Sequence, residues 1–460
     1  MSETHLVILA AGKGTRMKGR LPKVLHEAGG LPLIEHVLRT AAAFSPTSTI
    51  VVVGHEAERM KKLLDKRPGL LFALQEPQLG TGHALLQTEP FLRGRTGTLV
   101  LLSGDVPLLT RGTLTELVEL HRARRAAATV VTAVMSDPAG YGRIIRGEGK
   151  IAAIVEHRDA SPAEREIREI NSGIYAFDLP PLFEAVRKIG QLNAQGEYYL
   201  PDLVRIFRAQ GFAVETLVVD NPNEIAGVNS RQELAEVAAV MKNARNAEVM
   251  AAGVTLVDPA TTWIGPDVSI GADTVVHPNV YLEGHTRIGD ECVIHANVRI
   301  VDSAIGSRVT INNFCVITES RIDDGARVGP FAHIRPGSEI GPEVHIGNFV
   351  ELKKTSMGRG AKANHLAYLG DATIGARVNV GAGTITCNYD GVAKHPTVIE
   401  DGAFIGSDSQ LIAPVRVGRG AYVAAGSSIT DDVPADALAI ARGKQVNKEG
   451  WAKRRGAQKK

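Results

Sequence analysis

The first half of the chain alternates short, wholly apolar runs with longer stretches in which apolar residues recur at the spacing of one helix face. Five runs have the length and composition of buried strands: Leu6–Ala10, Thr49–Val53, Leu70–Leu74, Thr98–Leu102 and Thr129–Val134. Three stretches between them predict helices: Leu33–Ala43, Glu56–Lys66 and Thr113–Arg124. This alternation predicts an α/β, Rossmann-like domain with a mostly parallel sheet and helices on both faces.

The second half follows a period of six. Aliphatic residues recur at every sixth position from Ile264 to Ile300, and a small or slim residue stands four positions after each of them. After one-residue shifts the same period resumes at Ile305 and Ile322, and it reappears from Ile374 onward. Such hexads build a parallel β-helix, in which each coil has three short faces and its aliphatic side chains point inward.

Leucine use marks the domain boundary, because residues 1–250 contain 31 leucines and residues 251–460 contain 7. Between the halves, a segment of helical spacing opens with Ser230 and Glu233, which stand at the spacing of a capping box. We interpret this helix as a connector, although it could equally be the last helix of the first domain. The predicted organisation is a first domain at 1–229, a connector at 230–250, a β-helix at 251–442 and a tail at 443–460.

The charge balance predicts no strongly basic surface on the folded part of the chain. The formal net charge is +2, yet residues 442–460 carry eight Lys or Arg and one Glu, so the rest of the chain has a net charge of −5. This argues against a nucleic-acid partner. We expect the Lys/Arg-rich tail, residues 443–460, to be disordered.

Cysteine use and hydropathy together indicate the compartment. Cys292, Cys315 and Cys387 are scattered and form no CxxC pair, which favours a reducing environment and argues against a zinc motif. The first apolar run follows an acidic start and lacks the basic flank of a signal peptide. No run approaches the roughly 20 apolar residues of a membrane span. We therefore expect a cytoplasmic protein.

The densest motif of the first half is Leu9-Ala-Ala-Gly-Lys-Gly-Thr-Arg-Met17, which directly follows a predicted strand and precedes Leu21-Pro-Lys-Val24. Glycines at this point let backbone N–H groups approach a polyphosphate, and Lys13, Arg16 and Lys23 supply positive charge. Neither GxxxxGK[ST] nor GxGxxG is present in this motif, which disfavours a P-loop NTPase and a dehydrogenase. The motif predicts a phosphate-binding loop of another kind.

Asp105 ends the run that begins at Thr98, so it should lie at the carboxyl end of a central strand, where α/β sheets bind ligands. Its oxygen donors suit Mg²⁺, which neutralises phosphate charge. Further along the chain, Glu156 and Asn171 supply a carboxylate and an amide, the natural pair for binding hydroxyl groups. No Ser/His/Asp or Cys/His set is evident, so the expected catalysis is positioning and charge neutralisation.

The sequence GxGTRM followed by PK resembles the signature of the sugar-nucleotide pyrophosphorylases. That resemblance implies in-line attack of a sugar 1-phosphate on the α-phosphorus of UTP, with release of pyrophosphate. It implies nucleotide binding by Leu9, Ala10, Gly12, Gly14, Arg16, Lys23, Gln75, Gly80 and Thr81, the last three contacting the uracil. It also implies sugar binding by Gly142, Glu156, Asn171 and Asn229, and Mg²⁺ binding by Asp105 and Asn229.

Two segments of the second half, 353–373 and 384–398, contain more residues than the six-residue register needs. We expect both to leave the solenoid as loops, where binding groups tend to lie. The first of them places His365 between basic clusters and near Tyr368. Acyl transfer to an amine needs a base that takes the proton of the attacking nitrogen, and histidine suits that task near neutral pH.

In its order of motifs, the chain from residue 1 to about 442 resembles a family of bifunctional enzymes that join such a uridylyltransferase to a hexapeptide-repeat acetyltransferase. The resemblance implies a left-handed β-helix and makes His365 the general base. It implies that glucosamine 1-phosphate is held by Arg335, Lys353, Tyr368, Asn379, Asn388 and Lys394. It implies that acetyl-CoA lies against Ala382, Asn388, Tyr389, Ser407, Ala425 and Arg442.

The implied function is synthesis of UDP-N-acetylglucosamine for peptidoglycan: acetylation of glucosamine 1-phosphate, then uridylyl transfer to N-acetylglucosamine 1-phosphate. A homotrimer is expected, because β-helix prisms present flat faces and two open ends. Two alternatives stay open. One is a single nucleotidyltransferase with a regulatory or oligomerising β-helix. The other is a trimeric metal hydratase, suggested by His277 and His295, which stand 18 residues or one coil apart.

Overall fold

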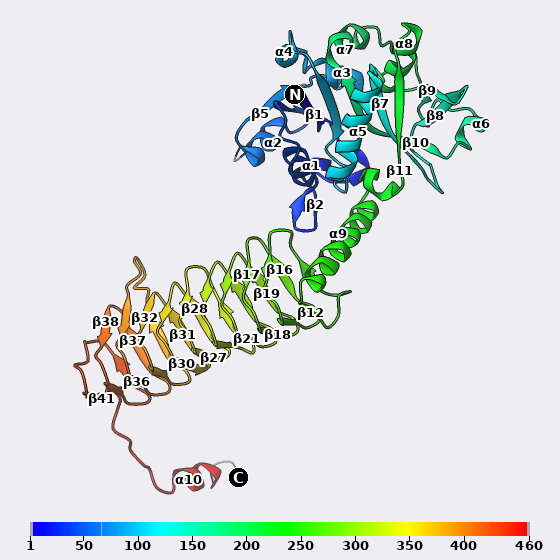
Figure 1. Cartoon of the computed structure of the whole chain (residues 1–460). Helices are drawn as coiled ribbons and strands as arrows, with labels where there is room; N and C mark the ends of the chain where they lie inside the picture. The colour runs from blue at the N-terminus through cyan, green and yellow to red at the C-terminus, as the bar shows by residue number, and fades with distance from the viewer. Residues whose placement is uncertain (1–2, 66, 458–460) are drawn as a thin grey trace. The chain divides into compact units, whose positions relative to one another are not determined.

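The computed structural model describes residues 3–65 and 67–457, which fold into two compact units that divide between Met241 and Lys242. The dividing point lies inside α9 (Arg231–Ala251), the helix expected at 230–250. Figure 1 shows a first unit of mixed helices and strands and a second unit of stacked coils. The boundary at residue 250 rests on leucine use and the boundary at residue 229 on the start of helical spacing, and both stay predictions.

The first unit is organised around one nine-stranded sheet. Seven strands lie in the order β11-β7-β10-β6-β1-β4-β5, and β8 and β9 form a hairpin joined to β10. The strands are β1 Thr4–Leu9, β4 Ser48–Val53, β5 Leu70–Leu74, β6 Thr98–Ser103, β7 Ala128–Val134, β8 Arg143–Gly147, β9 Lys150–Val155, β10 Glu169–Asp178 and β11 Val214–Val219; a separate pair is β2 Glu27–Ala28 and β3 Leu31–Pro32. The five expected strands are all present, and the mostly parallel sheet is confirmed. β10 differs, because it runs antiparallel to β6 and β7.

Helices cover both faces of this sheet. Along β1, Leu6 and Ile8 join a core with α1, α2 and α5, while Val7 joins a second core with α3, α7 and α8. The helices are α1 Leu33–Ala42, α2 Ala57–Leu64, α3 Thr81–Leu86, α4 Glu89–Leu92, α5 Arg111–Arg124, α6 Pro162–Arg165, α7 Leu179–Val186 and α8 Leu203–Ala209. The helix expected at Glu56–Lys66 is α2, and Lys66 itself lies outside the described residues. None of the helices within the described ranges is both long and apolar enough to cross a membrane.

The carboxyl ends of β1 and β6 are neighbours, because Leu9 pairs with Ser103 in a parallel register. The glycine-rich loop after β1 and Asp105 after β6 therefore leave the sheet at the same edge. Two short 3-10 helices follow the loop, η1 (Thr15–Met17) and η2 (Lys23–Leu25). This edge is where the ligands of α/β sheets bind.

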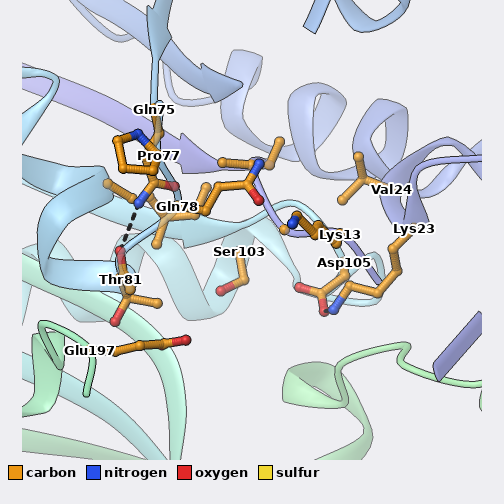
Figure 2. Close-up of a pocket in the computed structure, with 16 residues that line it drawn as sticks. Lys13, Lys23, Val24, Gln75, Pro77, Gln78, Thr81, Ser103, Asp105 and Glu197 are labelled. Atoms are coloured by element: carbon orange, nitrogen blue, oxygen red, sulfur yellow. Dashed lines mark hydrogen bonds and ion pairs between the residues drawn. The ribbon is translucent and has the colours of Figure 1, made fainter. Parts of the chain in front are cut away.

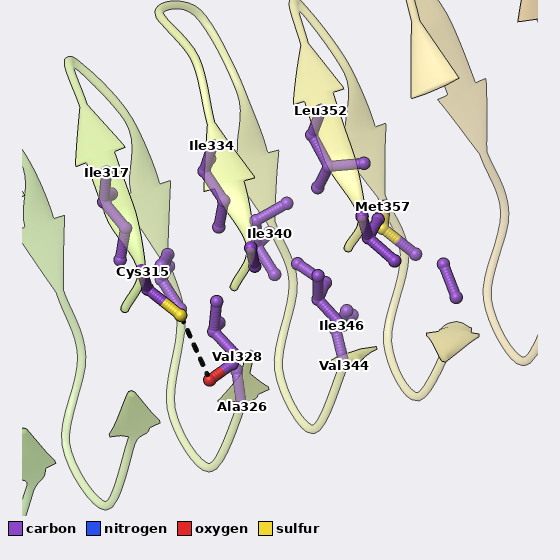
Figure 3. Close-up of a cluster of buried hydrophobic side chains, with 14 of the residues drawn as sticks. Cys315, Ile317, Ala326, Val328, Ile334, Ile340, Val344, Ile346, Leu352 and Met357 are labelled. Carbon is purple, nitrogen blue, oxygen red and sulfur yellow. Dashed lines mark hydrogen bonds between the residues drawn. The ribbon is translucent and has the colours of Figure 1, made fainter. Parts of the chain in front are cut away.

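The second unit is a parallel β-helix of three sheets that contain 11, 10 and 9 short strands. Its strands run from β12 (Thr255–Leu256) to β41 (Leu438–Ala439), and each pairs in parallel with a strand one coil away. Aliphatic residues of the expected register, such as Ile294, Ile311 and Val328, stack in one buried core. Figure 3 shows part of this core, in which each coil contributes side chains to a continuous stack. The expected β-helix is confirmed.

The prediction of a loop at 353–373 is wrong, because these residues stay in the solenoid. Met357, Ala363 and Leu369 are buried and fill the inward positions, so a complete coil lies where the pattern of branched aliphatics lapses. The loop expected at 384–398 is present as residues 388–396. The strands around both segments are β27 His345–Asn348, β28 Glu351–Lys353, β29 Ser356–Met357, β30 Lys362–His365, β31 Tyr368–Gly370, β32 Ala372–Ile374, β33 Asn379–Val380, β34 Ile385–Cys387, β35 Thr397–Ile399, β36 Phe404–Ile405 and β39 Tyr422–Val423.

The tail differs from the disorder that its charge predicts. Trp451–Ala457 form α10, in which the Arg455 guanidinium lies over the Trp451 ring, 5.1 Å from its centroid. Ala, Lys and Arg favour helix, and residues four apart share a helix face, which the charge count alone does not register. Residues 458–460 of the tail lie outside the described part of the chain.

The approach of two coils at Gly347 gives a test of the solenoid. A Cβ on Gly347 would lie 1.9 Å from the carbonyl oxygen of Asn364 on the next coil. Because both backbones are held in the same hydrogen-bonded ladder, neither can withdraw without breaking it. We expect Gly347→Ala to lower the free energy of unfolding of the β-helix by about 2 kcal/mol, measured by guanidinium-induced unfolding.

Gly443→Ala is the matched control. Among the described residues, no heavy atom lies within 4 Å of a Cβ built on Gly443, so this variant should unfold at the wild-type midpoint. An unchanged midpoint for Gly347→Ala would contradict the close approach of the coils.

Candidate functional site

The glycine-rich loop and the ends of β1 and β6 surround a cavity of about 660 Å³ (Figure 2). Most of the expected nucleotide-binding residues line it, together with the expected metal ligand: Leu9, Ala10, Gly12, Lys23, Gln75, Gly80, Thr81 and Asp105. Gly14 and Arg16 lie on the following turn, and Arg16 is exposed in η1. Gln78, Ser103 and Glu197 also line the cavity. Sequence reasoning did not select these three, because single polar residues in loops and at strand ends carry no distinctive signal.

The glycine-rich loop is tightly packed at Gly14 and has free space at Gly12. Gly14 has φ of 60°, and a Cβ on it would lie 2.7 Å from the Cβ of Lys23, so only glycine lets the loop pack on η2. Around Gly12, by contrast, none of the described heavy atoms lies within 4 Å of such a Cβ. The backbone at Gly12 can therefore be approached closely by a ligand in the cavity.

Gln75, Gly80 and Thr81 form one rigid group on another wall. The buried Gln75 side chain donates from Nε2 to the carbonyl oxygen of Gly80 at 2.9 Å. Gly80 has φ of 103°, and a Cβ there would lie 2.8 Å from the carbonyl oxygen of Tyr198. Thr81 Oγ1 accepts a hydrogen bond from the backbone N–H of Leu200 at 3.1 Å. A fixed set of polar groups of this kind suits recognition of a planar base.

The two expected metal ligands, Asp105 and Asn229, are brought together from distant parts of the sequence. The backbone N–H of Val228 donates to the carbonyl oxygen of Asp105 at 2.9 Å, which places Asn229 beside Asp105. Lys23 Nζ is ion-paired with the Asp105 carboxylate and donates to Asn229 Oδ1 at 3.0 Å. Two side-chain oxygens thus converge on one positive charge, and such an oxygen set fits a hard divalent cation.

The first turn of α9 fixes Asn229 and the glycine-rich loop. Glu233 Oε2 accepts from the backbone N–H groups of Asn229 at 2.5 Å and Ser230 at 3.2 Å, and Ser230 Oγ accepts from the Glu233 N–H at 3.1 Å. The expected capping box is therefore present. Arg231 donates from Nε to the carbonyl oxygen of Met17 at 3.3 Å, a contact across 214 residues that no local motif predicts.

A second cavity, of about 190 Å³, shares Leu9, Thr81 and Ser103 with the first. Three of the four expected sugar-binding residues line it: Gly142, Glu156 and Asn171. The fourth, Asn229, lies beside Asp105 instead. The structure therefore brings the expected nucleotide and sugar residues to two adjoining cavities.

Glu156 and Tyr175 set the polarity of the smaller cavity. Burial raises the pKa of Glu156 above its ordinary 4.5, and the carboxylates of Asp159 and Asp202 raise it further. Burial also raises the pKa of Tyr175, whose hydroxyl donates to Asn171 Oδ1 at 2.9 Å. Tyr175 reads as a core aromatic in the sequence, yet this contact orients the Asn171 amide.

In the second unit, His365 ends β30 at an exposed corner of the β-helix, opposite Asn348 on the preceding coil. His365 Nδ1 lies 2.7 Å from Asn348 Oδ1. Because an amide oxygen can only accept, Nδ1 of the neutral ring carries the proton and Nε2 is the basic nitrogen. Sequence reasoning missed Asn348, since only the register of adjacent coils brings it to His365.

The same corner of the next coils carries three of the residues expected along acetyl-CoA. The parallel registers of β30, β33, β36 and β39 stack Ala382, Ser407 and Ala425 in continuation of His365. Arg442 Nη1 donates to the carbonyl oxygen of Ala425 at 2.6 Å, which fixes a guanidinium at the end of this column. Small side chains therefore leave one continuous strip of accessible backbone beside His365.

Cationic side chains gather at the far end of the neighbouring sheet, where β28 ends at Lys353. Arg335 and Lys353 occupy equivalent positions on adjacent coils, because the Arg335 N–H donates to the carbonyl oxygen of Leu352. The neighbouring Lys353 ammonium lowers the pKa of Lys394, which stands on the 388–396 loop. Neighbouring ammonium groups of this kind can attract an anion such as a phosphate group.

Tyr368 and Asn388 meet over Gly370. A Cβ on Gly370 would lie 2.5 Å from Tyr368 Oη and 2.7 Å from Asn388 Nδ2, so the absent side chain leaves room for both. Asn379 is on β33 in register with Lys362. The exposed Tyr389 pairs with Lys394 in an isolated bridge and donates its hydroxyl to the carbonyl oxygen of Gly391 within the 388–396 loop.

His277 and His295 stack as the one-coil spacing predicts, with ring centroids 4.8 Å apart. Burial and the charge of His277 lower the pKa of His295. Over residues 3–65 and 67–457, however, no three or more His, Cys, Asp or Glu side chains group together as metal ligands. The hydratase alternative therefore gains no support from the structure.

Comparison with known proteins covers both units. Residues 6–168 match the MobA-like NTP transferase domain, and residues 267–302, 319–354 and 396–431 match the bacterial transferase hexapeptide (six repeats). "Bifunctional protein GlmU" of Shouchella clausii is 50% identical over 455 residues, which are 99% of this chain and 100% of that protein. The protein of the same name from Bacillus velezensis is 52% identical over 454 residues, 98% of this chain and 99% of its own.

Among solved structures, a putative glucose-1-phosphate thymidylyltransferase from Bacillus anthracis superposes with a TM-score of 0.42 at 20% identity. The match covers 52% of this chain and 95% of that one. A likeness this loose carries no argument about function.

Glu156 makes the stability of the first unit depend on pH. Because its pKa is raised in the folded state, the unfolded chain loses this proton first, and stability falls as pH rises from 4.5 through the raised value. Glu156→Gln keeps the shape and cannot ionise. We expect its Tm to exceed that of the wild type at about pH 7 and the difference to vanish toward about pH 4, in thermal melts followed by circular dichroism.

Glu119→Gln on α5 is the control, because Glu119 is exposed and its substitution should leave the melting profile as it is. Parallel pH profiles for Glu156→Gln and the wild type would contradict the raised pKa.

Proposed function

Because the chain belongs to the bifunctional GlmU family, whose members are both uridylyltransferases and acetyltransferases, we propose that its two units catalyse successive steps of UDP-N-acetylglucosamine synthesis. The second unit would transfer acetyl from acetyl-CoA to glucosamine 1-phosphate. The first unit would then transfer uridylyl from UTP to N-acetylglucosamine 1-phosphate and release pyrophosphate. The observation that carries the proposal is the contact between His365 and Asn348, which presents a basic nitrogen at an exposed corner of the β-helix.

The proposed acetyl transfer uses His365 as general base. Its Nε2 takes a proton from the amino group of glucosamine 1-phosphate as the nitrogen attacks the thioester carbonyl. An N–C bond forms, the C–S bond breaks, and coenzyme A leaves as a thiolate that takes up a proton. Asn348 supports this step because its oxygen keeps the proton of the neutral ring on Nδ1.

The sugar phosphate and the acetyl donor would lie on either side of His365. Arg335, Lys353 and Lys394 supply the charge for the phosphate, and the proposed polar contacts to the sugar come from Tyr368, Asn379 and Asn388. Acetyl-CoA would run along the column of small residues, and its proposed contacts are Ala382, Asn388, Tyr389, Ser407, Ala425 and Arg442. The mutual repulsion of Lys353 and Lys394 supports this assignment, because a phosphate relieves it.

The proposed uridylyl transfer is an in-line attack by the phosphate oxygen of N-acetylglucosamine 1-phosphate on the α-phosphorus of UTP. Gln75, Gly80 and Thr81 would hold the uracil, and the loop from Leu9 to Arg16 would hold the triphosphate with Lys23. Gly142, Glu156 and Asn171 would position the acceptor in the adjoining cavity. The reaction is then accelerated by positioning and by neutralisation of phosphate charge.

Nucleotidyl transfer of this kind uses a divalent metal, and we propose that it is Mg²⁺ held by Asp105 and Asn229. The fit rests on the two oxygens that converge on the Lys23 ammonium. When bound, the cation would supply positive charge to the phosphates. The chain's own part is to hold these oxygens in place through the Val228 and Glu233 hydrogen bonds.

We further propose a homotrimer with the acetyl-transfer site completed between subunits. Phe314, Phe331 and Phe349 support it, because their exposed rings stack with centroids 4.8 and 5.2 Å apart and Phe349 directly follows Asn348. All three have φ between 53° and 62°, an unfavourable backbone for a bulky residue. Exposed aromatic ladders of this kind mark interfaces. The three unpaired cysteines are consistent with the proposed cytoplasmic location.

The single-activity alternative, in which the β-helix serves only for assembly or regulation, is less favoured. A platform needs neither a histidine held in one tautomer nor two ammonium groups that face each other. His365 has the first feature, and Lys353 with Lys394 on the 388–396 loop has the second.

Separation of the two activities tests the proposal. With glucosamine 1-phosphate, acetyl-CoA, UTP and Mg²⁺ supplied, we expect His365→Ala to reduce thiol release about 100-fold or more. Pyrophosphate release from N-acetylglucosamine 1-phosphate should stay at the wild-type rate. Asp105→Ala should give the reverse, and the two products are measured by separate colorimetric assays.

Each variant serves as the folding control of the other. If one substitution abolished both activities while circular dichroism stayed unchanged, the assignment of one reaction to each unit would be wrong.

The role proposed for Asn348 predicts an effect on turnover without a matching effect on substrate affinity. Asn348→Ala should lower kcat for acetyl transfer roughly tenfold or more and leave KM near the wild-type value. The carboxylate of Asn348→Asp also accepts a hydrogen bond from Nδ1–H, so this variant should retain most of the activity. A wild-type kcat for Asn348→Ala in steady-state assays would contradict the role of Asn348.

A further inference from the structure

The ammonium group of Lys23 stands between the two oxygens proposed to hold the divalent cation. It is ion-paired with Asp105 and donates to Asn229 Oδ1 at 3.0 Å. The Lys23 and Asp105 side chains are only 18% and 15% exposed, so little water competes for these contacts. The chain itself therefore places a positive charge against the Asp105 carboxylate and the Asn229 oxygen.

The Lys23 backbone is fixed, whereas its side chain keeps rotatable bonds beyond Cβ. Lys23 begins η2, whose next two residues, Val24 and Leu25, are buried. On the other side, Gly14 packs so closely on Lys23 that a Cβ there would lie 2.7 Å from the Lys23 Cβ. The four-carbon side chain beyond this anchor can swing, so the ammonium can change partners without movement of the loop.

A second set of partners for Lys23 lies in the same cavity. Lys23 and Asp105 line it together with Gly12 and Lys13, where a triphosphate would bind. An ammonium group and a divalent cation cannot both occupy the space between Asp105 and Asn229. Phosphate oxygens offer the ammonium an alternative of the same charge as the Asp105 carboxylate.

We propose that Lys23 is a built-in substitute for the divalent cation: it neutralises Asp105 and blocks both metal-binding oxygens in the free enzyme, and it moves to the phosphates when the nucleotide binds. The inference rests on the proposed uridylyltransferase site. It means that the free enzyme binds the metal weakly and that nucleotide binding makes the site available. A population held in the blocked state lowers the apparent affinity by the fraction that remains competent.

Two binding measurements on the full-length protein test this exchange. Mn²⁺ binding to the nucleotide-free enzyme is followed by the loss of the electron paramagnetic resonance signal of free Mn²⁺. UTP binding is measured by titration calorimetry in the presence of a chelator. Lys23→Met should bind Mn²⁺ at least about tenfold more tightly than the wild type and metal-free UTP about tenfold more weakly. A purely structural role would weaken both.

Matched variants separate the effect of the Lys23–Asp105 contact from the effect of any positive charge in the cavity. Lys13→Met removes a charge from the same cavity and should change Mn²⁺ affinity less than about threefold. Lys23→Arg keeps the charge and should bind Mn²⁺ as weakly as the wild type. If Lys23→Met is too unstable to study, Lys23→Gln can be used, since its amide can still donate to Asp105 without a charge.

The outcomes distinguish this inference from the proposed function. Equal Mn²⁺ affinities for the wild type, Lys23→Met and Lys23→Gln would overturn the proposal that Lys23 takes the place of the cation. In that case, loss of Mn²⁺ binding in Asp105→Asn would still support the proposed metal site. If Asp105→Asn added to Lys23→Met left Mn²⁺ binding unchanged, the proposed metal site would be wrong and the role of Lys23 with it.

Discussion

Backbone hydrogen bonds between successive coils are the constraint on which the β-helix and its candidate site depend. Each short strand bonds to strands one coil away, so residues about 17 positions apart become neighbours, as Asn348 and His365 do. Gly347 permits this spacing because its neighbour across the ladder is backbone. The ladder thereby converts a linear repeat into columns, and one column holds the base, its orienting amide and the small residues beyond them.

The first unit depends on a different constraint, the common edge at which parallel strands end. The Leu9–Ser103 register brings the glycine-rich loop and Asp105 to one place, although they are far apart in the sequence. At this edge, Lys23 forms an ion pair with Asp105. The net charge of the chain therefore does not predict its binding sites. The binding sites depend on a few Lys and Arg side chains that are held next to carboxylates or to proposed phosphate positions.

Short-range patterns carried most of the prediction. Apolar runs gave the five strands, the six-residue period gave the β-helix, and Ser230 with Glu233 gave the start of α9. The expected nucleotide and sugar residues largely line two adjoining cavities because their motifs lie at strand ends, which topology brings together. Each of these features is encoded within a few residues of the position it concerns.

Features that depend on distant partners were not predictable. The coil at 353–373 was missed because Met357 and Ala363 replace branched aliphatics at inward positions. The direction of β10 follows from its pairing with β6 and β7, not from its own composition. The contacts of Arg231 with Met17 and of Asn348 with His365 exist only in the folded chain. Neither composition nor residue spacing predicts these contacts.

The start of α9 limits where the chain can be divided. Glu233 caps the helix and also holds the backbone N–H of Asn229, while Arg231 holds the end of the glycine-rich loop. A cut after residue 229, where the helical spacing of the connector begins, would leave the first half with Asn229 as a frayed end and without both of these contacts. A separately expressed first half therefore needs the opening turns of the helix that we expected to be a connector.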